Sequence, residues 1–288
     1  MAMGRVAGDR AVLAMTGSAV RTVLQDVVTA DVAPLAPGRA VYAALLTPQG
    51  KYLFDFFLLD GRGREGAGLA GLPEDAVLVD VAADRAEALA KRLTMYCLRR
   101  DARMAGPVAL GVAQVFAADG PAPAPAAPDG GLTVADPRHP ALGHRLYAPD
   151  PGAALAAAGV EPAQDGAWEA LRVVLEVPET GVELVPEDTF VLEAGLDRLG
   201  GVDFRKGCYV GQEVTARMRH KTELRKRLVT VSVEGTAPAG TPVTTAEGKP
   251  AGTLFTAAGG RALAHLRLDR ATGPLTAGEA RVTYDPDA

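Results

Sequence analysis

The sequence has few cysteines and no long apolar run. Cys97 and Cys208 are the only cysteines among 288 residues, which is too few for a disulfide-stabilised scaffold and indicates a reducing compartment. No stretch approaches the roughly 20 apolar residues that a membrane-spanning helix requires, and residues 1–12 lack the apolar run of a signal peptide. We therefore expect a cytoplasmic protein that does not bind membranes.

The sequence also lacks a strong positive charge and several signatures of known sites. A net charge of −5 gives no overall basic field for holding nucleic acid, so any anion must bind through a local group of cations. The G-x-x-x-x-G-K-[ST] motif of ATP-binding loops is absent. The four histidines lie outside C-x-x-C and H-E-x-x-H contexts, which argues against a zinc site, and we expect no stably bound metal.

The chain does contain enough apolar residues for a large core, and their pattern changes along its length. Hydrophobic residues make up 48% of the sequence. The first two-thirds mix helical and strand patterns, whereas beyond Leu228 the apolar runs become short and are separated by glycine and proline. This change predicts an α+β region followed by a small C-terminal β-barrel. The expected barrel strands are residues 229–233, 242–245, 252–256, 262–268 and 280–284.

The first third of the chain has clear local patterns. Ser18 is a suitable N-cap for a helix over residues 19–28, whose apolar side chains repeat at helical spacing. Residues 41–46 and 52–59 are apolar, aromatic-rich runs separated by Thr47-Pro48-Gln49-Gly50. Such an arrangement is typical of two strands joined by a hairpin turn.

Further elements follow toward the C-terminus. Cys97 lies on the apolar face of a helix expected over residues 83–98, so we expect it in the core. The prolines of residues 121–128 cannot continue a helix or a central strand, which predicts an exposed loop. The remaining expected elements are strands at residues 76–81 and 108–116 and a helix at residues 163–174.

The surroundings of Cys208 combine a thiol with cations and glycines. Positive side chains nearby lower the pKa of a cysteine from about 8.5 and so increase the fraction of reactive thiolate. Gly207 and Gly211 allow backbone amides to approach an anion or cofactor closely. A buried cysteine that only fills space is the alternative, and the residues alone leave both interpretations open. The cations are Arg205, Lys206, Arg217, Arg219, Lys221, Arg225, Lys226 and Arg227.

The basic run after Cys208 has two interpretations that do not involve the thiol. Residues beyond Arg219 fit the solvated edge of a helix or strand. A nucleic-acid-binding module would use the same cations as a phosphate-contacting strip, but the run lacks interleaved aromatic residues. We therefore expect no nucleic-acid partner.

Three segments resemble a known family. Residues 206–213, Lys-Gly-Cys-Tyr-Val-Gly-Gln-Glu, are similar to the K-G-C-[FY]-x-G-Q-E signature of the YgfZ family. Residues 136–146 resemble the D-P-R-x-x-x-L-G-x-R segment of the same group, and residues 199–204 resemble its approach to the cysteine motif. The similarity covers nearly the whole chain.

Members of this family are relatives of the glycine-cleavage T-protein, a tetrahydrofolate-dependent aminomethyltransferase. The resemblance implies an α+β fold with three domains in a ring around a folate-sized channel. Residues 1–220 would form a folate-binding region of two interleaved subdomains, and residues 221–288 a C-terminal β-barrel domain. It also implies assembly or repair of [4Fe–4S] clusters, with Lys206 and Cys208 matching the motif residues tied to activity. Expected partners are tetrahydrofolate or a derivative and iron–sulfur client enzymes or cluster carriers, and we expect a monomer.

The resemblance to the T-protein suggests residues that contact folate. Asp55 ends a segment similar to G-G-x-[IL]-D-D, in which the second aspartate orients the reacting amine, although Phe54 replaces the first. Asp80 falls near a folate-binding asparagine of T-proteins, and Arg172 near an arginine in a matching helix. The other candidates for cofactor binding are Tyr209, Gln212, Glu213 and Arg217.

A working aminomethyltransferase is the alternative function. It needs a folate pocket and a carboxylate near the reacting nitrogen, which is the role expected of Asp55. The T-protein pocket also uses a glutamate in a G-Y-E-I segment, but residues 143–146 here are Gly-His-Arg-Leu and contain no acid. An exposed strand residue is the simpler interpretation of Asp55. The sequence favours the assembly factor and leaves open whether any reaction is catalysed.

The cysteine count limits what iron–sulfur chemistry the chain can perform. A protein that carries a cluster usually supplies about four cysteine ligands. This chain offers Cys208 and an expected core residue, Cys97, so it cannot be an ordinary cluster carrier alone. Cys208 either ligates iron transiently with a partner or performs thiol redox chemistry beside folate, and both require an exposed thiol.

Overall fold

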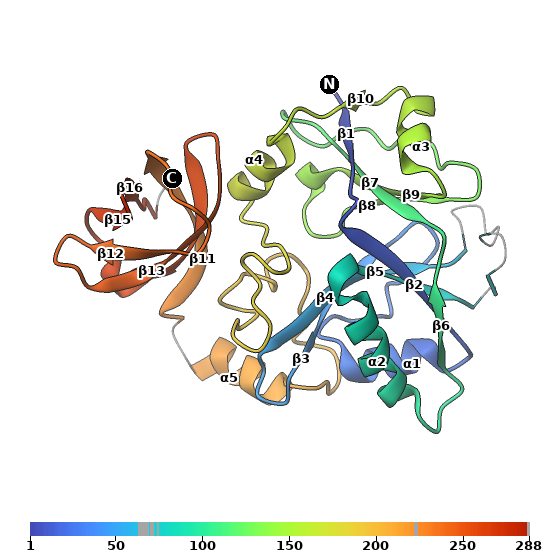
Figure 1. Ribbon diagram of the computed structural model, residues 1–288. Coiled ribbons are helices and arrows are strands. Elements are labelled where there is room, and N and C mark those ends of the chain that lie inside the picture. The colour runs from blue at the N-terminus through green and yellow to red at the C-terminus, as the bar shows by residue number, and fades with distance from the viewer. Residues whose placement is uncertain (63–68, 70–71, 74, 222–223, 287–288) are drawn as a thin grey trace. The chain divides into compact units, whose positions relative to one another are not determined.

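In a computed structural model, the chain folds into two compact units (Figure 1). The structure describes residues 1–62, 69, 72–73, 75–221 and 224–286. The first unit contains residues 1–46, 54–163 and 198–210, and the second contains residues 47–53, 164–197 and 211–288. Each unit is therefore assembled from segments that are distant in the sequence.

Two five-stranded sheets form the first unit. The strand order is β10-β1-β7-β9-β8 in one sheet and β3-β4-β5-β2-β6 in the other. The strands of the first sheet are β1 (Met3–Val6), β7 (Gly111–Phe116), β8 (Leu132–Ala135), β9 (His144–Ala148) and β10 (Glu161–Pro162). Those of the second are β2 (Arg10–Thr16), β3 (Val41–Leu46), β4 (Tyr52–Asp60), β5 (Val77–Ala82) and β6 (Arg103–Pro107).

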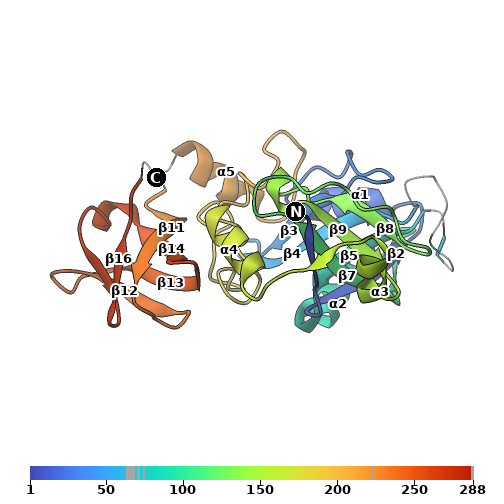
Figure 2. The ribbon, with the colours of Figure 1, turned by 90° about the horizontal axis from the view of Figure 1, so that it is seen from above.

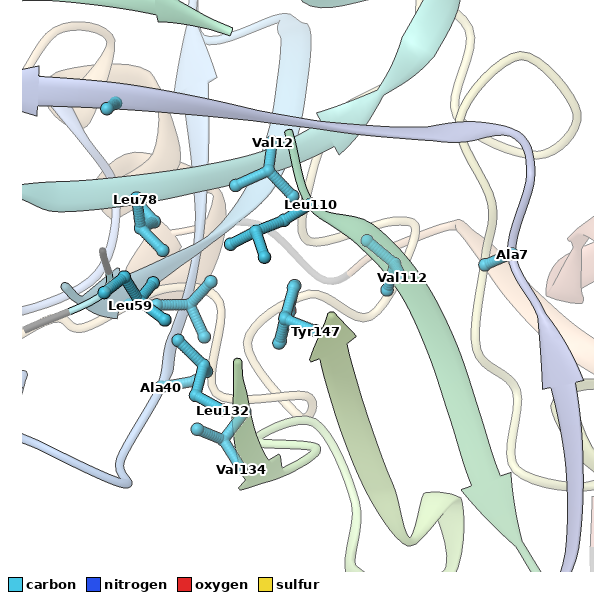
Figure 3. Close-up of a cluster of buried hydrophobic side chains, with 12 residues drawn as sticks. Ala7, Val12, Ala40, Leu59, Leu78, Leu110, Val112, Leu132, Val134 and Tyr147 are labelled. Carbon is cyan, nitrogen blue, oxygen red and sulfur yellow. The ribbon is translucent and has the colours of Figure 1, made fainter. Parts of the chain in front are cut away.

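A cluster of buried hydrophobic side chains joins these two sheets (Figure 3). Val12, Leu59 and Leu78 come from one sheet, and Val112 and Tyr147 come from the other. Every residue of β3 and β4 is buried, which explains why these strands are continuous apolar runs in the sequence. Removing this apolar surface from water is the main source of stability for the unit.

Two helices of the first unit, α1 and α2, lie where the sequence predicts them, whereas α3 was not predicted. In α1 the buried residues include Val20, Leu24 and Val27, three members of the predicted apolar stripe. The N-cap is Ala19, however, and the predicted capping role of Ser18 is wrong because its hydroxyl donates to Asp101 at 2.6 Å instead. The helices are α1 (Val20–Val27), α2 (Ala86–Cys97), α3 (Pro151–Ala157) and the short η1 (Ala83–Arg85) and η2 (Pro140–Leu142).

The second unit combines helices, an irregular segment and a closed barrel. Helix α4 (Ala167–Val174) begins later than the predicted residue 163, directly after Gly166, which has a left-handed conformation with φ 76°. Residues 175–197 contain turns and isolated bridges without a regular helix or strand. Helix α5 (Gln212–Lys221) follows, and no helix in the described part of the chain is long and apolar enough to span a membrane.

The barrel is closed by β11, which pairs with both β14 and β16 (Figures 1 and 2). Five of its strands match the predicted ranges, whereas the three-residue β15 was too short to be recognised. At Gly252 a Cβ atom would lie 2.0 Å from the carbonyl oxygen of His265, so β13 and β14 require glycine there. The strands are β11 (Lys226–Glu234), β12 (Thr241–Thr245), β13 (Pro250–Ala258), β14 (Arg261–Arg267), β15 (Leu275–Ala277) and β16 (Ala280–Thr283), and η3 (Leu268–Arg270) follows β14.

Candidate functional site

Cys208 lies on an exposed loop. Residues 201–209, here called the cysteine loop, contain no helix or strand. Cys208 is exposed, whereas Cys97, the last residue of α2, is only 6% exposed. Burial raises the pKa of the Cys97 thiol, although the charge of Arg100 opposes the effect. The prediction of Cys97 as a core residue is confirmed, and Cys208 is the thiol that solvent reaches.

Lys206 anchors the cysteine loop to the backbone of the first unit. Its Nζ donates to the carbonyl oxygens of Val28 at 2.6 Å and Ala30 at 2.9 Å. It also lies 5.3 Å from the ring centroid of Tyr209, a buried neighbour in the loop. Burial lowers the pKa of Lys206 to about 8, against the opposing charges of three aspartates led by Asp31. The ammonium group therefore has a positioning role as well as a charge.

Thr29 fixes the start of the cysteine loop to β3. Its Oγ1 donates to the carbonyl oxygen of Gly201 at 2.5 Å and accepts from the Ala44 N–H at 2.8 Å. The Thr29 carbonyl oxygen accepts a further bond from the Asp203 N–H at 2.9 Å. Because Thr29 is fully buried, these bonds are shielded from competing water. The loop is thus held at its start by a threonine and near its thiol by Lys206.

Two predicted folate contacts in α5 bond to each other. Arg217 donates to the Glu213 carboxylate at 2.9 Å, and both side chains are exposed. Arg219 lies 3.6 Å from the carboxylate of Asp197. Gln212 is the first residue of the helix and is half-buried. A role in cofactor binding for Gln212, Glu213 and Arg217 stays a prediction.

The remaining predicted cations are solvated or lie outside the described residues. The side chain of Arg205 is 95% exposed. Residues 225–227 are exposed at the start of β11, in agreement with a solvated strand edge. The side chain of Lys221 is outside the described part of the structure. In the described part, the cations near Cys208 in sequence are thus a mixture of anchored, paired and solvated groups.

Asp55 lies in β4 and is buried. Its exposed fraction is 4%, and the hydroxyl of Tyr42 in β3 donates to its Oδ2 at 3.0 Å. The Tyr42 ring lies 5.2 Å from the Phe57 ring, which supports this geometry. The interpretation of Asp55 as an exposed strand residue is therefore wrong, because all residues of β4 are covered. Its contact with folate stays a prediction.

Asp80, another predicted folate contact, is the centre of a buried ion cluster. Its Oδ1 accepts from Arg10 at 2.7 Å, and its Oδ2 accepts from Arg145 at 2.5 Å and from the Tyr147 hydroxyl at 2.7 Å. Burial alone raises the pKa of Asp80, but the charges of Arg10 and Arg145 and the hydrogen bonds outweigh it and hold the pKa below its usual value. Both carboxylate oxygens already have partners, and a folate contact stays a prediction.

A second carboxylate extends this cluster. Asp136 accepts from Arg138 at 2.7 Å and lies 3.5 Å from Arg145. The guanidinium groups of Arg10, Arg138 and Arg145 lie 5.6, 4.9 and 3.9 Å from the ring centroid of Phe57, within the range of cation–π attraction. Residues of both sheets are thereby tied together. The Asp80 cluster is defined as Asp80, Asp136, Arg10, Arg138, Arg145 and Tyr147.

Two members of the Asp80 cluster, Arg10 and Tyr147, were not predicted from the sequence. Arg10 was not singled out, because nothing in the sequence shows that it pairs with a residue 70 positions away. A signal existed for Tyr147, since Arg145 and Tyr147 are two residues apart and side chains at that spacing share one face of a strand. The hydroxyl of Tyr147 accepts from Arg145 at 2.9 Å.

Arg172, predicted to contact folate, is buried in the second unit. Its guanidinium donates to the carbonyl oxygen of Val177 at 2.8 Å and to the Thr256 hydroxyl at 3.2 Å, and it lies 3.0 Å from the Glu179 carboxylate. These contacts join α4 to the irregular segment and to β13. Its role toward folate stays a prediction.

The candidate residues do not assemble into a metal site among the described residues. No group of three or more histidine, cysteine, aspartate or glutamate side chains in that part of the chain could hold a metal ion. The structure brings Lys206 together with Tyr209, and Glu213 with Arg217. Asp55 and Asp80 each have separate protein partners.

The C-terminal barrel matches a family model. The model describes the CAF17 C-terminal β-barrel domain and matches residues 225–288. These residues include all six strands that close the barrel. The prediction of a small C-terminal β-barrel is therefore confirmed.

The whole chain has the fold of a known aminomethyltransferase. The glycine cleavage system aminomethyltransferase T from Bartonella henselae aligns with a TM-score of 0.73 over 100% of this chain and 86% of that protein. The two sequences are 15% identical, so this similarity establishes the fold alone. The predicted T-protein-like α+β fold is confirmed.

Sequence relatives are more specific. The mitochondrial iron–sulfur cluster assembly factor IBA57 of Mus musculus is 35% identical, over 82% of this chain and 67% of that protein. The Homo sapiens protein of the same name is 31% identical with the same coverage. The IBA57 homolog of Pyricularia oryzae is 33% identical over 77% of this chain, which spans little more than half of that relative, 55%.

These relatives correct two predictions and establish the family. They are mitochondrial proteins, so the predicted cytoplasmic location is wrong. They are also IBA57 proteins, which supports the wider group and not the YgfZ type in particular. With 35% identity over two-thirds of the mouse protein, an aminomethyltransferase fold and a matching barrel, the chain belongs to the IBA57 family of iron–sulfur cluster assembly factors.

Proposed function

We propose that the chain assists the assembly or repair of [4Fe–4S] clusters in client enzymes, with the Cys208 thiol as its working group. The observation that carries this proposal is an exposed thiol on a loop that Thr29 and Lys206 hold in place. The relatives named as iron–sulfur cluster assembly factors support the same role. Its proposed partners are client enzymes or cluster carriers, which it meets as a monomer.

A single exposed thiol suits a transient role in cluster chemistry. Thiolate sulfur is the usual ligand of iron in such clusters, which take about four of them. Of the two cysteines in the chain, Cys97 is buried in α2 and Cys208 is exposed. Cys208 therefore supplies one ligand while the partner protein supplies the others. Exposure of the thiol lets a partner reach it without unfolding of the loop.

We also propose tetrahydrofolate or a derivative as a ligand, with Asp55 as its main contact. A buried carboxylate whose direction is fixed by the Tyr42 hydroxyl is a well-placed acceptor for the N–H groups of a pterin ring. The carboxylate of Asp80 and the guanidinium of Arg172 are engaged by protein groups. These two residues therefore act through the local structure that they stabilise.

The test of the assembly role uses the second cysteine as a matched control. In cells that depend on this chain, Cys208→Ser should lower the activity of [4Fe–4S] enzymes while the protein level stays unchanged. Cys97→Ala also removes a thiol, but from a buried position, so a variant that folds should support normal client activity. Full client activity with Cys208→Ser as the sole copy would refute the proposal.

Aminomethyltransferase activity is the second candidate function, and the buried, hydrogen-bonded Asp55 favours it. The two candidates separate in an assay that measures tetrahydrofolate binding by calorimetry and methylene transfer from an aminomethyl-lipoyl donor. Binding without transfer supports the assembly factor. Transfer that Asp55→Asn abolishes supports the methyltransferase, because the variant keeps the shape of the side chain and loses its charge.

A further inference from the structure

The second unit contains a cavity of about 610 Å³ that none of the roles above uses. This volume lies within the range of about 300–1,000 Å³ that is typical of small-molecule sites. One side of the cavity is lined by residues of β11, β13 and β14, and another by residues between 183 and 193. Neither Lys206 nor Cys208 is among its lining residues.

Five cationic side chains line the cavity, and two of them are available for a ligand. Among the residues that the structure describes, the side chains of Arg225 and Lys226 form no hydrogen bond or ion pair. Both residues are exposed, so a ligand can reach them from solvent. The other three cations are Lys51, Arg267 and Arg270, which are engaged by backbone oxygens or by Asp269.

The three carboxylates in the lining offset the five cations only in part. Glu183 is fully buried, and the Thr256 hydroxyl donates to it at 2.5 Å. Burial raises the pKa of Glu193, although nearby lysines, first among them Lys226, oppose the effect. Asp188, the third carboxylate, is exposed. The cavity therefore keeps an excess of positive charge in a chain whose net charge is −5.

His265 adds an unsatisfied polar atom to the same cavity. Its Nε2 is buried and has no hydrogen-bond partner among the described residues. Burial, assisted by the charge of Lys226, lowers the pKa of His265 to about 4, so the ring is neutral near pH 7. The Phe255 ring meets it edge-on, with 6.0 Å between the centroids. Buried polar groups in native proteins nearly always have a partner, and a bound ligand would supply one here.

We propose that this cavity binds a small organic anion that carries a phosphate or carboxylate group. Arg225 and Lys226 bind the oxyanion, His265 forms a hydrogen bond with a polar atom nearby, and Phe255 covers an apolar part of the ligand. Oxyanions are favoured because hydrogen bonds between charged groups are stronger than neutral ones.

Titration of the full chain with inorganic phosphate and, separately, with citrate tests this proposal. The readout is the NMR signal of the His265 ring, assigned by its loss in His265→Gln and followed at constant ionic strength. At least one of the two anions should shift this signal saturably. Tighter binding of phosphate identifies a phosphorylated ligand, and tighter binding of citrate identifies a polycarboxylate.

A neighbouring arginine provides the matched control. The double variant Arg225→Gln/Lys226→Gln should weaken binding about tenfold or more, since each lost charged hydrogen bond costs more than about 1 kcal/mol. Arg227→Gln removes the next cation of β11, which does not line the cavity, and should leave binding unchanged. The absence of a saturable shift with both anions, or an equal loss in Arg227→Gln, would overturn the proposal.

Discussion

The Asp80 cluster and the cysteine loop lie in the same unit, but their polar side chains are used in different ways. In the cluster, charged side chains bond to one another in the interior, and Asp80 and Arg145 have almost no contact with solvent. At the cysteine loop, Lys206 donates to backbone carbonyls, Thr29 donates to the carbonyl oxygen of Gly201 in the loop, and the Cys208 thiol stays exposed. The first arrangement ties two sheets together, whereas the second leaves a thiol accessible to solvent.

This difference predicts different roles for the two segments that carry the family resemblance. The 136–146 segment contributes Asp136, Arg138 and Arg145 to the interior, where their loss should destabilise the fold. The 206–213 segment contributes an exposed thiol, whose loss should affect function and leave the fold intact. Burial and hydrogen bonding of each side chain distinguish the two cases, although both segments resemble the same family.

The largest expected effect is that of Arg145→Met on stability. Removing this buried cation leaves Asp80 and Asp136 short of a partner, and breaking a buried ion pair costs about 3–5 kcal/mol. Urea unfolding measures the loss. Arg261→Met, at an exposed position of β14, should change the free energy of unfolding by less than about 0.5 kcal/mol. A similarly small change for both variants would show that the Asp80 cluster does not stabilise the fold.

Acid should weaken the Asp80 cluster selectively. The pKa values of Asp80 and Asp136 are held below the ordinary 3.8, so the unfolded chain binds protons first as the pH falls. Their stabilisation is complete above 3.8 and is lost as the pH falls through the lower pKa values of the folded state. Urea midpoints measured against pH should therefore fall more steeply for the wild type than for Arg145→Met. Parallel curves would contradict this origin of acid sensitivity.

Thr29→Val should have a smaller effect, confined to the attachment of the cysteine loop. The substitution preserves shape but removes the hydroxyl that bonds to Gly201 and Ala44, at a cost of about 1–3 kcal/mol. Amide hydrogen exchange in residues 201–206 should accelerate more than exchange in β3. Thr94→Val, which removes an exposed hydroxyl in α2, serves as the control. Equal exchange in both variants would show that Thr29 does not hold the loop.

The sequence predicts those parts of the fold that depend on local patterns. The hairpin of β3 and β4, five barrel strands and the buried position of Cys97 follow from apolar periodicity and turn residues. The capping role of Ser18 fails because Asp101, 83 residues away, takes its hydroxyl. Long-range partners of this kind also determine the Asp80 cluster.

The candidate site was predicted as a set of residues without their partners. Cys208 and Lys206 were selected from a motif, but the motif gives no indication that Lys206 bonds to carbonyl oxygens 176 and 178 residues away. Asp55 was selected as a folate contact, with an exposed strand residue as the alternative, and neither interpretation included the packing of β4 that buries it. Burial of a polar side chain depends on the assembled sheets, which no local pattern encodes.

Alkylation of the folded chain tests the central claim, an exposed thiol on an anchored loop, most directly. Iodoacetamide modification of each cysteine is followed by mass spectrometry under native conditions. Cys208 should react at a rate close to that of a free thiol, and Cys97 should react only when the chain unfolds, so urea should accelerate the modification of Cys97 alone. A Cys208 as protected as Cys97 in the folded chain would contradict the account.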